Sequence, residues 1–107
     1  MKTLPGVSTE LLIPQIKEKL DLIDRIYDKY HAGEAVVTST NGGQHMFSSL
    51  HYKNAAIDFR LPHTNQSAVY KAIRRALGDE FDVVPEETHL HVEYDPHKPK
   101  ALKGENI

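Results

Sequence analysis

Two histidines and one aspartate in this sequence have the types and spacing of a metal site. His51 and Asp58 lie seven positions apart, and His91 follows in a later segment. Two imidazole nitrogens and one carboxylate suit Zn²⁺, and a zinc ion with three protein ligands keeps one coordination position open for water. Each residue taken alone is better explained as a solvated polar side chain, so the prediction depends on all three coming together. We expect one zinc ion bound by His51, Asp58 and His91 in a catalytic arrangement.

The segments around Asp58 and His91 alternate between apolar and polar residues, as strands with one buried face do. The larger apolar side chains of 55–60 share one face, and Asp58 falls on the other. In 88–94 the apolar side chains again share one face, and His91 falls on the other together with His89. An antiparallel sheet can bury one face under helices and leave the other for a site. We therefore expect an α+β fold with a small antiparallel sheet, helices on one face and the zinc site on the other.

The remaining segments supply the helices and the other strands. Apolar residues recur at helical spacing in an N-terminal and a central segment. Pro14 is tolerated in the first turn of the N-terminal helix, and Gly33 is expected at its end. Thr64 or Asn65 can cap the central helix, which should end at Gly78. The expected elements are a helix over about 13–31, strands over 34–39 and 55–60, a helix over about 65–77, and strands over 81–84 and 88–94.

Length and composition are those of one domain spanning 1–107. Lys and Arg number 13 against 15 Asp and Glu, so the formal net charge is -2 and no basic field favours nucleic acid. Cysteine is absent, which excludes disulfides and thiolate ligands. No window approaches the roughly 20 apolar residues of a membrane span, and no secretory signal is visible. We expect a monomer with flexible termini over 1–8 and 96–107.

The residues around the first two expected ligands resemble a known peptidase signature. Ser49-x-His51 followed by Ala56-x-Asp58 matches the Ser-x-His-x-x-Gly-x-Ala-x-Asp pattern of the D-Ala-D-Ala metallopeptidase family. That family includes zinc D-alanyl-D-alanine carboxypeptidases and dipeptidases, and phage endopeptidases that cleave peptidoglycan. The resemblance covers about residues 35–94. It implies that the signature histidine and aspartate are zinc ligands.

The His89-Leu90-His91 stretch extends the resemblance. It is similar to the zinc site of the hedgehog signalling domain, which shares this fold, and there the second histidine of such a pair completes the ligand set. The resemblance therefore implies His91 as the third ligand, with His89 as its substitute. Asn54 stands where the family usually has Gly. A left-handed or otherwise unusual backbone is expected at this position, because Asn adopts it more readily than most residues.

The resemblance also implies residues that assist hydrolysis. The family places an acidic general base just before the last ligand, and Glu86 fits its Glu-x-x-His spacing, with Glu87 as a rival one position on. His89 is expected beside the zinc ion as a proton carrier or oxyanion donor. The upstream arginine that many of these peptidases use has no counterpart here, so His45 is expected to act as the positive donor, with Gln44 as another candidate. A solvated loop position is the alternative for His45.

The function that the resemblance implies is hydrolysis of a peptide bond in bacterial peptidoglycan stem peptides by a metal-activated water. The action is that of a D-Ala-D-Ala carboxypeptidase or of an endopeptidase. The short chain resembles compact bacteriophage enzymes, which are made in the bacterial cytoplasm and act on the cell wall. The competing prediction is a non-catalytic, zinc-stabilised binding module of hedgehog-like fold, in which no acidic base is needed.

Overall fold

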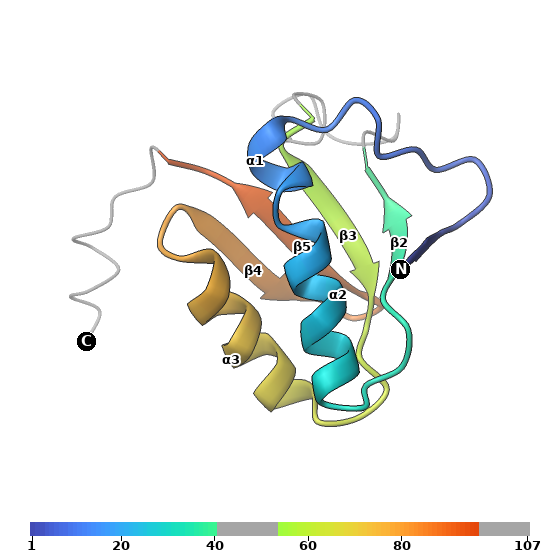
Figure 1. Ribbon diagram of the computed structural model, residues 1–107, viewed down its shortest axis with the longest axis vertical. Helices are drawn as coiled ribbons and strands as arrows, with labels where there is room; N and C mark the ends of the chain where they lie inside the picture. Colours follow the sequence, from blue (N-terminus) through green and yellow to red (C-terminus); the bar gives the residue numbers. More distant parts are fainter. Residues whose placement is uncertain (41–53, 97–107) are drawn as a thin grey trace.

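The computed structural model describes residues 1–40 and 54–96, and these form three helices and five strands. In chain order the elements are β1 (Lys2–Thr3), α1 (Pro14–Lys17), α2 (Leu20–Lys29), β2 (Val36–Ser39), β3 (Ala56–Arg60), α3 (Gln66–Leu77), β4 (Phe81–Pro85) and β5 (His89–Tyr94). The helices lie together on one side of the sheet (Figure 1). The expected α+β class is confirmed.

The sheet has the strand order β1-β2-β3-β5-β4. The pairs β2–β3, β3–β5 and β5–β4 are antiparallel, as expected. At the edge, however, β1 runs parallel to β2, so the sheet is mixed and the prediction of a purely antiparallel sheet is wrong at this strand. Parallel neighbours need a long crossover connection, which the chain supplies here through α1 and α2. A strand of two residues has no alternation from which this pairing could be predicted.

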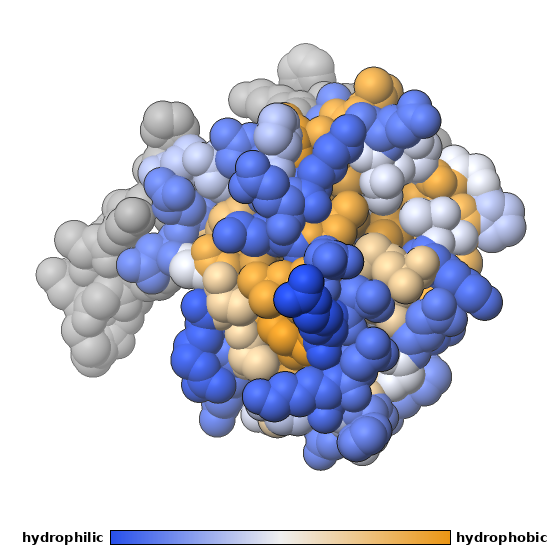
Figure 2. Space-filling model, in the orientation of Figure 1, coloured by the Kyte–Doolittle hydropathy of each residue, from blue (hydrophilic) through white to orange (hydrophobic). Residues whose placement is uncertain are grey.

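One face of the sheet packs against α2 and α3. Both helices are amphipathic and turn their apolar stripes to the sheet. Burying one large apolar side chain contributes about 1.5–3 kcal/mol, so this layer is a major source of stability. The buried side chains are Ile23, Ile26 and Tyr27 of α2, Val69, Ile73 and Leu77 of α3, Ile57 and Phe59 of β3, and Leu90 and Val92 of β5. From the helical side, hydrophilic residues surround a strip of apolar surface (Figure 2).

The N-terminal helix differs from the single helix expected over about 13–31, because the structure divides it into α1 and α2. At the division, the Lys19 N–H donates to the Ile16 carbonyl at 2.9 Å. This three-residue spacing makes a tighter turn than an α-helix and redirects the chain. Ile16 and Ile23 lie on either side of the division and are each 1 % exposed. Both segments therefore still bury their apolar sides.

Several turns have the backbone conformations that the sequence predicted. Gly78 follows α3 with φ 89, and Asn54 has φ 59, the left-handed conformation expected there. Gly33 does not end the N-terminal helix as expected, because α2 already ends at Lys29. It has φ 90, and a Cβ at this position would lie 2.7 Å from Nδ1 of His63, so glycine is favoured there. Asn65 precedes α3, but its side chain donates to a carbonyl at the end of α2 at 2.8 Å and does not cap the helix. It ties the two helices together instead.

Candidate functional site

Strands β3 and β5 bring two of the predicted metal ligands together on the face of the sheet opposite the helices, which we call the site face. In the antiparallel register Asp58 lies directly opposite His91, and Arg60 lies opposite His89. Phe59, between the polar residues Asp58 and Arg60 of β3, is fully buried in the core on the helical face. The alternation predicted for both strands is therefore confirmed. Asp58 and His91 meet although 33 positions separate them in the chain.

A hydrogen bond joins Asp58 to His91. The distance between His91 Nδ1 and Asp58 Oδ1 is 2.9 Å. The side chain of Asp58 is 8 % exposed and that of His91 is 18 % exposed. Burying a carboxylate is costly unless a charged or polar partner compensates, and the imidazole provides that partner. The pair thus stabilises the site face and brings two zinc-type donor groups side by side.

The second ring nitrogen of His91 contacts another carboxylate. The distance between His91 Nε2 and Glu93 Oε1 is 2.6 Å. The hydrogen bond with Asp58, supported by the one with Glu93, raises the pKa of His91 to about 9, although burial acts in the opposite direction. Without a metal ion the ring is therefore an imidazolium between two carboxylates at neutral pH. A metal ion that binds this histidine has to displace a proton.

Glu86 lies beside this pair in the turn between β4 and β5, and His89 lies there as the first residue of β5. His89 Nε2 is 3.3 Å from Glu86 Oε1 and 3.7 Å from Asp58 Oδ2. The Thr88 hydroxyl lies 3.1 Å from His89 Nδ1 and so also contacts the ring. Within 54–96 no hydrogen bond or ion pair connects the exposed Glu87 to these groups. The geometry therefore favours Glu86 over Glu87 as the acidic side chain of the site.

The remaining predicted site residues fall in a segment that the structure does not describe. His51, the third predicted ligand, and His45, the predicted positive donor, both lie outside the described residues, as does Gln44. Their roles stay predictions. Four of the six predicted catalytic and metal-binding residues can be located, namely Asp58, Glu86, His89 and His91, and these four lie together.

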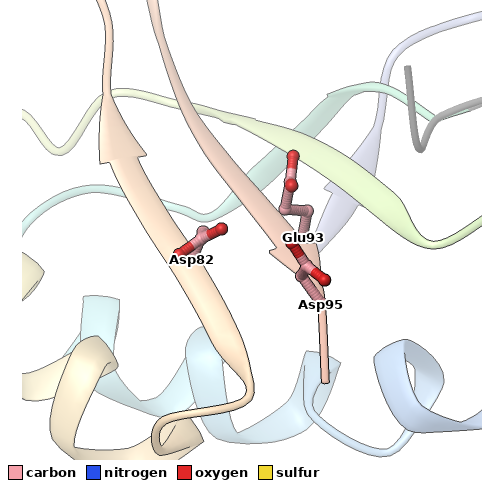
Figure 3. Close-up of side chains that lie close together, drawn as sticks. All are labelled: Asp82, Glu93 and Asp95. Carbon is pink, nitrogen blue, oxygen red and sulfur yellow. The ribbon is translucent and has the colours of Figure 1, made fainter. Parts of the chain in front are cut away.

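A second group on the site face was not expected from the sequence. Asp82 of β4 points toward Glu93 and Asp95 of the β5 region, and oxygens of the three carboxylates lie within 4.8 Å of one another (Figure 3). All three residues are partly buried, and Asp82 pairs with Glu93 in the strand register. An all-oxygen set suits a hard cation such as Ca²⁺ or Mg²⁺ better than zinc. The described residues therefore include a candidate metal-binding group of acidic side chains.

Arg60 is a further cation on the site face. It follows Asp58 by two positions on β3 and so shares its face, a signal already present in the sequence. Its Nη2 donates to the carbonyl of Glu34 at 2.9 Å, which anchors the guanidinium near the start of β2. Arg60 is thus a fixed positive charge on the same strand face as the site.

Compared with known proteins, the chain matches no family model, no curated protein and no solved structure. Among the described residues, no helix combines the length and apolar character needed to cross a bilayer. A fold of this class carries many unrelated functions, so function is inferred from the site itself.

Proposed function

We propose that this protein is a zinc-dependent peptidase that hydrolyses a peptide bond in bacterial peptidoglycan stem peptides, as a D-Ala-D-Ala carboxypeptidase or an endopeptidase. The observation that carries the proposal is the convergence of Asp58, His91, His89 and Glu86 on the site face. The chemistry of these side chains supports metal-assisted hydrolysis. The substrate class rests on the resemblance of the Ser49 to Asp58 stretch to the D-Ala-D-Ala metallopeptidases.

The donor set fits a zinc ion. Asp58 offers a buried carboxylate, and its two oxygens face two imidazoles, those of His91 and His89. Zinc binds such nitrogen and oxygen donors with three protein ligands at catalytic sites. His51 would complete the set with Asp58 and His91.

Each of these residues would have its own role in the hydrolysis. When bound, zinc supplies Lewis acidity, which lowers the pKa of a water and polarises the scissile carbonyl. Glu86 takes the proton from the attacking water and returns it to the leaving amine. Its side chain is 47 % exposed, so a substrate can reach it. His89, 3.3 Å from Glu86, donates to the developing oxyanion, with His45 as the second predicted donor.

The proposal is tested with Glu86→Gln, which keeps the size of the side chain and removes the base. Wild type should bind zinc and release D-alanine from a synthetic stem peptide, or fragments from purified wall material. Glu86→Gln should bind zinc equally and lose about 10²–10⁴-fold in rate. Glu87→Gln is the matched control and should keep its rate. If Glu87→Gln is the inactive variant and Glu86→Gln keeps its rate, Glu87 is the general base and Glu86 is not.

The competing function is a zinc-stabilised binding module of hedgehog-like fold. It requires tight zinc binding without turnover of any stem peptide or wall material by the wild type. That combination of results would refute the peptidase and support the module.

A further inference from the structure

The imidazole of His91 is hydrogen-bonded at both nitrogens by carboxylates from different positions in the sheet. Asp58 lies on the neighbouring strand β3 and contacts Nδ1 at 2.9 Å. Glu93 lies two positions further along β5 and contacts Nε2 at 2.6 Å. The two contacts fix the orientation of the imidazole ring, because each nitrogen has its own partner and the two partners lie at different positions in the sheet.

An imidazole binds a metal ion through the lone pair of one nitrogen, while the other nitrogen carries a proton and needs an acceptor. Because Asp58 is the predicted co-ligand and contacts Nδ1, this is the nitrogen that His91 would offer to an ion held by both residues. Nε2–H would then donate to Glu93. We propose that Glu93 is a positioning residue that holds His91 with Nδ1 toward Asp58, so that Nδ1 is the atom offered to the metal. This inference rests on the proposed zinc site.

The placement of Glu93 in the sheet supports a positioning role. β5 is an inner strand, and Glu93 is paired with Ala56 on one side and with Asp82 on the other. Its backbone is therefore held from both sides, and its side chain is only 22 % exposed. Ligand-orienting groups work when they are mounted on rigid elements in this way.

Glu93→Gln provides a matched control, because it removes the negative charge and keeps an oxygen that can accept from Nε2–H. If Glu93 acted only through its negative charge, Glu93→Gln would weaken zinc binding about as much as Glu93→Ala. If Glu93 acts by orienting His91, the two variants differ.

The experiment measures zinc affinity by competition with a chromophoric chelator. Glu93→Ala should bind zinc about 10–100-fold more weakly than wild type, the usual effect of losing a carboxylate that orients a metal-bound histidine. Glu93→Gln should recover part of the loss, since its amide oxygen still accepts from Nε2–H. Circular dichroism confirms that each variant is folded.

A second readout does not depend on any variant. Nitrogen-15 spectra of the zinc-loaded wild type should show His91 with a protonated Nε2 and a metal-bound Nδ1. Coordination through Nε2, or equal losses of affinity in Glu93→Ala and Glu93→Gln, would overturn the proposal while leaving the peptidase intact. Zinc binding with the expected Glu93 effect but without turnover would support the positioning role and overturn the peptidase. Absence of zinc binding by the wild type would overturn both.

Discussion

Replacement of Asp58 by asparagine should destabilise the metal-free protein. Asp58→Asn keeps the shape of the side chain and removes its charge, so the hydrogen bond with His91 loses its charged acceptor. The pair is 2.9 Å apart and its side chains are 8 % and 18 % exposed, so water screens it weakly. Hydrogen bonds to charged groups contribute about 1.5–3 kcal/mol.

We expect the free energy of unfolding to fall by about 2 kcal/mol at neutral pH, because Glu93 still pairs with the ring and part of the interaction survives. For a domain of this size the corresponding fall in Tm is on the order of 10 °C.

The measurement is urea unfolding followed by circular dichroism, with a chelator present so that metal binding adds no stability. Asp28→Asn, at an exposed position of α2, is the control and should change the free energy of unfolding by less than about 0.5 kcal/mol. An Asp58→Asn variant as stable as wild type would refute the view that this pair supports the site face.

Two further predictions concern stability. The pKa of His91 is raised from 6.5 to about 9, chiefly by Asp58, so its contribution to the stability of the metal-free protein is complete below about pH 6.5 and is lost as the pH rises through about 9. Urea unfolding of the wild type across this pH range should show the loss of stability. In His91→Asn the free energy of unfolding should depend less on pH; a pH profile equal to that of wild type would contradict the attribution to His91. Tyr27→Phe should cost about 1 kcal/mol in urea unfolding, because the buried Tyr27 hydroxyl donates to the carbonyl of Arg60 at the end of β3. Full stability in Tyr27→Phe would show that this bond contributes nothing net.

Features that depend on neighbouring residues could be predicted from the sequence. The two-residue alternation in 55–60 and 88–94 assigned Asp58 and His91 to polar strand faces, because successive side chains of a strand point to opposite sides. Asn54 signalled its left-handed backbone, and Gly78 signalled the end of α3, since both are local preferences of the chain.

Features that depend on pairing between distant segments were decided by the tertiary structure. The register that sets Asp58 opposite His91, and Asp82 beside Glu93, arises from packing of whole strands and has no signal in either segment alone. The parallel pairing of β1 with β2 likewise depends on where α1 and α2 lead the chain. The sequence determined which side chains are able to bind a metal ion and which are able to accept or donate a proton. Only the folded sheet decided that Asp58 would meet His91 on the nitrogen opposite Glu93, because the contact between Asp58 and His91 needs two strands in one register.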